Sequence, residues 1–171
     1  METWEVFRAR RNVRQFSADP IPAAALDRIL EAGWRSPSSK NEQRWDFVVC
    51  TERRQLQELS KAWVYGGHIA ASAATLVLLA PDVKEPGVRE SIQFDLGQVC
   101  MSVMLAAADL GIGSCHSAVG DQELVRRLLG HPLDRFAAMM ISLGYPAGRP
   151  LKPVQKPNRR PFDDVVHRGR W

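Results

Sequence analysis

A continuous apolar run in the middle of the chain, Thr75-Leu76-Val77-Leu78-Leu79, leaves few folds open to it. The run lacks the alternation of apolar and polar residues that marks a strand with one face in water. A strand without that alternation is typically covered on both faces by other elements. The sequence therefore predicts that residues 75–79 form a central strand of a sheet.

Helices alternate with strands along the rest of the chain, which indicates a mixed organisation of the two. Helices are expected over residues 26–33, 68–74, 96–107 and 121–130, and further strands over residues 46–51 and 136–143. The first helix ends before Ser36-Pro37, and Asp121 can cap the last one. Gly111 and Gly130 can close helices in the left-handed conformation.

The chain of 171 residues is most simply one domain, which would bury about two-thirds of the surface of its unfolded form. Its 45% hydrophobic and 25% charged residues are typical of a soluble globular protein and argue against disorder. The net charge of +4 would suit nucleic acid, a membrane surface or a phosphorylated ligand. The basic residues are not interleaved with aromatic ones, so a nucleic-acid module is disfavoured.

Three cysteines, Cys50, Cys100 and Cys115, form no CxxC pair, so neither a disulfide framework nor a metal site is expected. Cys115 and His116 are adjacent, but neighbouring side chains of a strand point to opposite faces. The N-terminus lacks a signal-peptide core, and the apolar stretch 69–81 is too short to cross a membrane. We therefore expect a cytoplasmic protein that does not bind membranes.

The C-terminal arm, residues 146–171, differs in composition from the rest of the chain. Prolines recur along it at a spacing that excludes a helix, and basic residues lie between them. It ends with the β-like pair Val165-Val166 and with Trp171, which is costly to leave in water. The arm is therefore expected either to cross to a partner subunit or to pack on its own domain.

An arginine cluster near the start of the chain, made of Arg8, Arg10, Arg11 and Arg14, is either an anion site or a solvated face. Four guanidiniums so close together repel one another unless a negative group or solvent intervenes. The sequence has no GxxxxGK[ST], GxSxG or GxGxxG motif, which removes the usual support for kinases, hydrolases and Rossmann dinucleotide folds. The remaining features indicate a binding site more than a proton-transfer centre.

Four segments, in order, resemble the FMN-dependent nitroreductase family. They are RRNVRQF (10–16), the polar turn SPSSKNEQRW (36–45), DLGQVCMSVMLAAADLGIGSC (95–115), and LGYP (143–146) with RRPFDDVVH (159–167). The resemblance implies an α+β nitroreductase-like fold over residues 1–171, with a mixed, mainly antiparallel sheet surrounded by helices. It also implies a homodimer with FMN at the interface, whose C-terminal arms are exchanged so that residues 165–166 extend the partner's sheet.

The resemblance answers the question that the arginine cluster raises. It implies that Arg10, Arg11 and Asn12 bind the FMN phosphate, with Arg159 or Arg160 joining from the arm. A phosphate with a charge near −2 is the group that guanidiniums bind best.

The residues that the resemblance places at the flavin ring are Arg14, Pro37, Ser38, Ser39, Asn41, Ser117, Ala118 and Val119. Arg14 would lie at the N1/O2 edge, where positive charge favours the anionic reduced flavin. The turn at 37–41 would bond the pyrimidine edge, and the backbone of residues 117–119 would face N5 and O4. Arg44 replaces the family's usual proline, and the short segment 80–95 leaves little room for a helical lid.

The implied activity is that of an FMN-dependent NAD(P)H oxidoreductase. NADH or NADPH would reduce the flavin at N5, and a nitroaromatic, quinone or related small-molecule acceptor would then replace it in a ping-pong cycle. The sequence offers no catalytic acid or base; Tyr65, His68 and His116 are either substrate neighbours or structural residues. The alternatives are an FMN carrier or sensor without turnover, and another flavin reaction such as reductive dehalogenation or ring dehydrogenation.

Overall fold

The computed structural model describes all 171 residues and contains one sheet of four strands. The strands are β1 (Asp46–Cys50), β2 (Ala74–Pro81), β3 (Gly113–Ser117) and β4 (Arg135–Gly144). Their order is β1-β2-β4-β3, and every pair of neighbours is antiparallel. Strand β2 is internal and is buried along almost its whole length, as its apolar run predicts.

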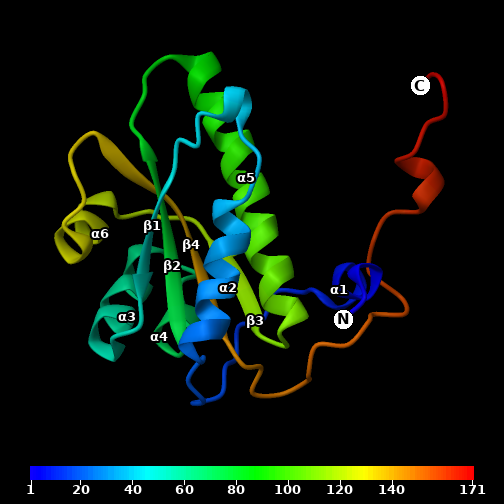
Figure 1. The fold of residues 1–171 in the computed structure, drawn as a ribbon, viewed down its shortest axis with the longest axis horizontal. Helices are drawn as coiled ribbons and strands as arrows, with labels where there is room; N and C mark the ends of the chain where they lie inside the picture. The colour runs from blue at the N-terminus through cyan, green and yellow to red at the C-terminus, as the bar shows by residue number, and fades with distance from the viewer.

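The chain has six α-helices (Figure 1). They are α1 (Thr3–Ala9), α2 (Ala23–Trp34), α3 (Arg53–Leu59), α4 (Gly67–Ala70), α5 (Pro86–Asp109) and α6 (Gln122–Leu129). Of these, α1 lies to one side beside α5, and the other five flank the sheet. The chain also has three short 3-10 turns: η1 (Ser39–Asn41), η2 (Ser60–Ala62) and η3 (Phe162–Asp164). The fold is therefore α+β, with α2 and α5 on one face of the sheet and α3, α4 and α6 on the other.

Two apolar clusters explain why β2 needs no polar face. Leu76 and Leu78 pack with residues of α2 and α5, whereas Val77 and Leu79 pack with residues of α3 and α6. Burial of each such side chain contributes about 1.5–3 kcal/mol to folding. The sheet is thus the middle layer of three, and β2 contributes to both cores.

Helix α5 is the longest element and the main support of the site described below. By length and composition alone it could cross a membrane, but half of its most apolar stretch is buried within the protein. Such burial is what the central helix of a globular core shows. The sequence predicts only residues 96–107 of it, because the first turns after Pro86 carry few apolar residues.

The other predicted strands and the capped helix are confirmed. Asp121 accepts a hydrogen bond from the amide of Leu124, and Gly111 and Gly130 have positive φ. The helix expected over residues 68–74 is only the single turn α4. Helices α1 and α3 were not predicted, since seven residues are too few for a clear apolar period.

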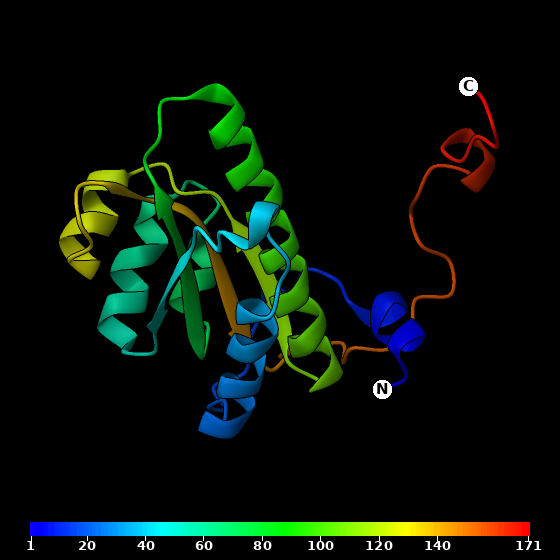
Figure 2. The ribbon, with the colours of Figure 1, turned by 45° about the horizontal axis from the view of Figure 1, so that its top comes forward.

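The C-terminal arm docks along the domain for only half of its length (Figures 1 and 2). The amide of Ala147 donates to the Gln15 carbonyl at 3.0 Å, and the amide of Val154 donates to the Arg8 carbonyl at 2.9 Å. Beyond that point the arm runs away from the domain, and Trp171 is 98% exposed. The alternative in which the end of the arm packs on its own domain is therefore wrong.

Residues 165–166 form no strand in the single chain, and their predicted pairing with a partner's sheet stays a prediction. Turn η3 ends at Asp164, and the amides of Val165 and Val166 both donate to the Phe162 carbonyl. These residues have no strand beside them to pair with, so local turn bonds take the place of sheet bonds.

Candidate functional site

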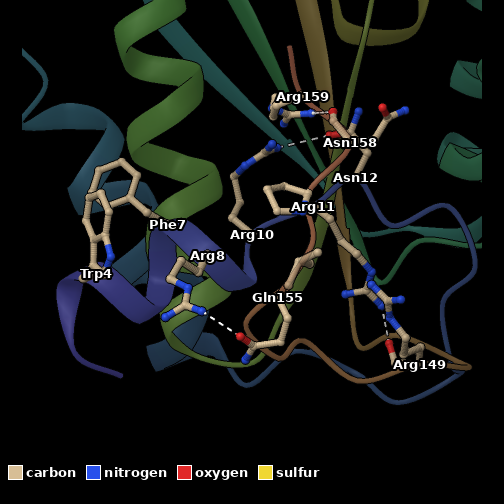
Figure 3. Close-up of a pocket in the computed structure, with 12 residues that line it drawn as sticks. Trp4, Phe7, Arg8, Arg10, Arg11, Asn12, Arg149, Gln155, Asn158 and Arg159 are labelled. Carbon is tan, nitrogen blue, oxygen red and sulfur yellow. Dashed lines mark hydrogen bonds between the residues drawn. The ribbon is translucent and has the colours of Figure 1, made fainter. Parts of the chain in front are cut away.

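A cavity of about 700 Å³ lies between helix α1, the segment that follows it, and the C-terminal arm (Figure 3). Its lining residues are Trp4, Phe7, Arg8, Arg10, Arg11, Asn12, Arg149, Val154, Gln155, Pro157, Asn158 and Arg159. We call it the arginine cavity. It joins the two ends of the sequence, because the bond from Val154 to Arg8 and a 3.0 Å bond from Arg8 to Gln155 hold the arm beside α1.

The lining of the arginine cavity contains five arginines and no carboxylate. Arg11 is the most constrained of them: one guanidinium nitrogen donates to the Arg149 carbonyl, and Nη1 is buried without any partner. Burial, and then the nearby charge of Arg149, lower the pKa of Arg11. A buried donor without a partner is costly, so this position favours an anionic ligand.

The backbone after the cavity is fixed on the edge of the sheet. The amide of Val13 donates to the Ser114 carbonyl of β3 at 2.9 Å, and Asn12 forms a parallel bridge with Ser114. Gly113 permits this approach, because a Cβ there would lie 2.8 Å from the Val13 side chain. The sheet therefore determines where Asn12 and the arginines on either side of it are presented.

Arg14 lies just beyond the arginine cavity, in an adjoining hollow that Arg11, Asn12 and Arg149 also line. Its charge acts on two buried groups of the neighbouring elements. It opposes the burial that raises the pKa of Cys115, and it adds to the burial that lowers the pKa of His68. Arg14 is thus close to the middle of β3 and to helix α4.

The polar turn lies elsewhere, beside the first half of α5. The amide of Ser39 donates to both carboxylate oxygens of Asp95, each at 3.1 Å, and the Ser38 hydroxyl accepts from the Gln43 amide at 2.9 Å. Lys40 and Asn41 have φ of 52° and 57°, a region that non-glycine residues seldom occupy. Such backbone strain persists only where surrounding contacts impose it, and it is frequent at ligand sites.

Asp95 is therefore expected to hold the polar turn in place. It is 3% exposed, and it is the acceptor that fixes the start of η1. Asp95→Ala should cost about 1–3 kcal/mol of unfolding free energy, since the Ser39 amide loses a charged acceptor. Denaturant unfolding measures this loss, and Glu90→Ala, at an exposed position of the same helix, is the control. Equal stability of the two variants would show that Asp95 does not support the turn.

Arg44, which stands where relatives have proline, forms an ion pair with Glu42. Its charge is thus neutralised within the turn. The departure from the family pattern therefore adds no free positive charge beside Trp45.

The end of β3 carries another buried polar atom without a partner. The Ser117 hydroxyl is enclosed and makes no hydrogen bond. The loop that follows is rigidly placed, because the amides of Gly120 and Asp121 both donate to the Ala62 carbonyl, at 2.8 and 3.0 Å. The structure thus fixes the path of residues 117–119 and leaves a hydroxyl there able to bond a ligand.

His68 of α4 is buried beside the same strands. Its Nδ1 lies 2.7 Å from the Ser142 hydroxyl of β4, which in turn donates to the Cys115 carbonyl at 3.2 Å. Burial, followed by the charges of Arg14 and His116, lowers the pKa of His68 from its ordinary 6.5. The folded protein therefore favours the neutral imidazole.

This shift predicts how stability depends on pH. In acid the unfolded chain binds a proton at His68 before the folded one does, so the protein loses stability as pH falls below about 6.5. The loss ends once the lower pKa of the folded state is passed, and it is at most about 1.4 kcal/mol per pH unit. His68→Gln should flatten this part of the profile in thermal unfolding from pH 7.5 to 5. An unchanged profile would contradict the assignment.

A single chain brings together only part of the predicted site. Arg10, Arg11, Asn12 and Arg159 all line the arginine cavity. Residues 37–41 and 117–119 do not line it, and Arg160 instead donates to the Asp164 carbonyl at 3.0 Å.

The sequence analysis missed four residues as site candidates: Asp95, Arg149, Gln155 and Asn158. Asp95 carried a readable signal, as an acidic residue at the start of the apolar stripe of α5. The others follow only from the docking of the arm.

A family model described as the nitroreductase family matches residues 7–66 and 61–145. This is more than half of the chain and includes the arginine cluster, the polar turn and β3. The chain belongs to the nitroreductase family. An Archaeoglobus fulgidus relative, named "Putative NADH dehydrogenase/NAD(P)H nitroreductase", is 32% identical to it over 175 residues that cover 99% of both chains.

Solved structures agree with this membership of the nitroreductase family. An FMN-dependent nitroreductase from Clostridium difficile superposes with a TM-score of 0.85 over 98% of this chain and 99% of its own, at 23% identity, and shows the shared fold. The NADPH:FMN oxidoreductase of Vibrio harveyi, complexed with NAD+, has a TM-score of 0.85 at 26% identity, over 99% of this chain and 77% of its own. The predicted nitroreductase-like fold is confirmed, and the protein is an oxidoreductase of this family.

Proposed function

We propose that the protein is an FMN-dependent NAD(P)H oxidoreductase that reduces nitroaromatics, quinones or similar conjugated acceptors by a ping-pong cycle. The observation that carries this proposal is the arginine cavity, with five guanidiniums, no carboxylate and the unpartnered buried Nη1 of Arg11. Because the chain belongs to the nitroreductase family, we take the anionic ligand of the cavity to be FMN, whose phosphate guanidiniums bind well. The free, buried cysteines are compatible with a cytoplasmic protein.

The residues present suit FMN at both of its ends. Arg10, Arg11 and Asn12, with Arg159, would hold the phosphate. The unpartnered Ser117 hydroxyl and the fixed backbone of residues 117–119 supply donors of the kind that a flavin ring requires. Of the four buried side-chain polar atoms without a partner, Nη1 of Arg11 and the Ser117 hydroxyl belong to segments expected to bind FMN, whereas Nε of Arg126 and Nε2 of His131 do not.

The proposal further holds that two chains build each site. The polar turn contacts α5 at Asp95, whereas α1 lies against the opposite end of α5, where the N-terminal amine is 2.6 Å from Asp109 (Figures 1 and 2). Fourteen residues of helix separate these contacts, or about 21 Å along the axis. In a dimer, Ser38, Ser39 and Asn41 of the second copy would contact the ligand that is bound in the arginine cavity of the first copy.

When bound, FMN would supply the hydride and electron chemistry, and this chain would bind, orient and tune it. Arg14 places a fixed positive charge near the middle of β3, which would stabilise added negative charge on a ligand there. Val64 and Tyr65 are exposed, Tyr65 packs against Trp63, and the segment between β2 and the middle of α5 is too short for a separate helical lid. An uncovered site of this kind suits flat acceptors of several shapes, and either NADH or NADPH as donor.

Purified protein with one FMN per chain should give parallel double-reciprocal lines when NAD(P)H and a benzoquinone are varied. Parallel lines are expected because the donor product leaves before the acceptor binds. Intersecting lines would contradict the ping-pong order. Bound FMN without turnover would favour a carrier, and protein that binds no FMN would contradict the proposed function altogether.

A further inference from the structure

His68 is a buried titratable group, joined by hydrogen bonds to β3 and β4, for which the function above has no use. It is 7% exposed, and buried polar side chains normally have hydrogen-bond partners. Its partner on one side is Ser142, which is fully buried in β4. The question is what its other nitrogen faces.

The proton of neutral His68 is assigned from the contacts of Ser142. The Cys115 carbonyl can only accept, so its 3.2 Å contact uses the single hydrogen of the Ser142 hydroxyl. The 2.7 Å contact between that hydroxyl and Nδ1 is then assigned to Nδ1–H as the donor. In the neutral ring Nε2 is therefore an acceptor with a free lone pair.

Nε2 of His68 is not completely enclosed. It has no hydrogen-bond partner within the chain, yet it is not among the polar atoms that are both enclosed and unpartnered. The charged groups that act on His68 are Arg14, from the segment on the edge of the sheet, and His116 of β3. The free lone pair thus belongs to a ring that shares its surroundings with Arg14, the residue expected at the N1/O2 edge of the flavin.

We propose that His68 is a redox-coupled proton acceptor, which is neutral beside the oxidised cofactor and takes up a proton at Nε2 when the cofactor is reduced. This inference rests on the proposed function. The nicotinamide donor loses a hydride and is oxidised, and the site gains two electrons, one hydrogen and one negative charge. A proton from solvent then binds the Nε2 lone pair; no other bond forms or breaks, and His68 exchanges no electrons.

The surroundings of His68 explain why this uptake would depend on redox state. Before the cofactor gains negative charge, burial of His68 and the positive charge of Arg14 oppose its protonation, so the pKa of His68 is low. Added negative charge beside Arg14 offsets that charge and favours the imidazolium. Ser142 keeps Nδ1–H bonded in both states, so the ring need not turn over when Nε2 gains its proton.

The test is the midpoint potential of the FMN-loaded protein measured against pH. One additional proton per two electrons changes the equilibrium tenfold per pH unit, which is about 30 mV. The wild type should show this extra slope between the pKa values that His68 has in the two redox states. His68→Gln, which cannot take up the proton, should lose it. His116→Gln, which changes the exposed neighbour on β3, is the matched control and should keep it.

A second measurement needs no variant. Side-chain NMR of wild-type protein should place the pKa of His68 about one unit or more higher with reduced than with oxidised FMN. Equal slopes in wild type and His68→Gln, or an unchanged pKa of His68 on reduction, would overturn the inference while the flavin activity stands. Protein that binds no FMN would overturn both the inference and the proposed function.

Discussion

Arg11→Ala should weaken FMN binding by about 10- to 100-fold and leave riboflavin binding nearly unchanged. The loss corresponds to one charge-assisted bond of about 1.5–3 kcal/mol, and only FMN has the phosphate that accepts it. Arg11 is chosen because its Nη1 is buried without a partner, so a ligand atom is the acceptor that the site lacks. Fluorescence quenching of each flavin by apo-protein measures both affinities.

Arg127→Ala is the control for that variant, because it removes the same charge from exposed helix α6, far from the arginine cavity (Figure 1). It should leave both affinities unchanged. If Arg11→Ala weakens riboflavin as much as FMN, the residue supports the arm through its bond to the Arg149 carbonyl and does not bind the phosphate.

Deleting residues from Pro157 onward should abolish both FMN retention and dimer formation, although every residue of the arginine cluster remains. The deletion removes Pro157, Asn158 and Arg159 from the lining of the arginine cavity. It also removes Trp171, whose ring in the single chain meets only that of His167, at 4.1 Å between centroids. An exposed tryptophan at the end of a projecting arm is a group that a second subunit would bury.

Light scattering and flavin absorbance of the truncated chain measure these two losses together. Trp171→Ala separates them, since it should weaken the dimer more than it alters the cavity. A truncated protein that stays dimeric and yellow would show that the end of the arm is dispensable, and it would remove Arg159 from the site.

The parts of the fold that could be predicted are those with a local physical cause. The run at 75–79 identifies the central strand because only a doubly covered strand tolerates it, and Asp121 and Gly130 delimit α6 by capping. The first turns of α5 could not be predicted, because Pro86 opens a stretch with few apolar residues. The end of the arm could not be predicted either, since valines form strands only where another strand is available.

In the candidate site, too, the features with a local cause could be predicted and those that depend on distant contacts could not. The arginine cluster is local, so the repulsion of like charges raises the question of a bound anion, and the resemblance to the nitroreductase family supplies the phosphate. Arg149 and Gln155 join it only because the backbone bond between Val154 and Arg8 folds the arm back over α1, a contact that spans most of the sequence. The hydrogen bonds of His68 join two strands and a helix, so no local pattern could indicate them.

Anaerobic mixing of the purified, FMN-loaded protein with NADH or NADPH is the measurement that tests the account most directly. The account predicts that the visible absorbance of the flavin bleaches within the time of one turnover, and that a quinone or nitroaromatic restores it. A flavin that stays oxidised with both nucleotides would contradict it.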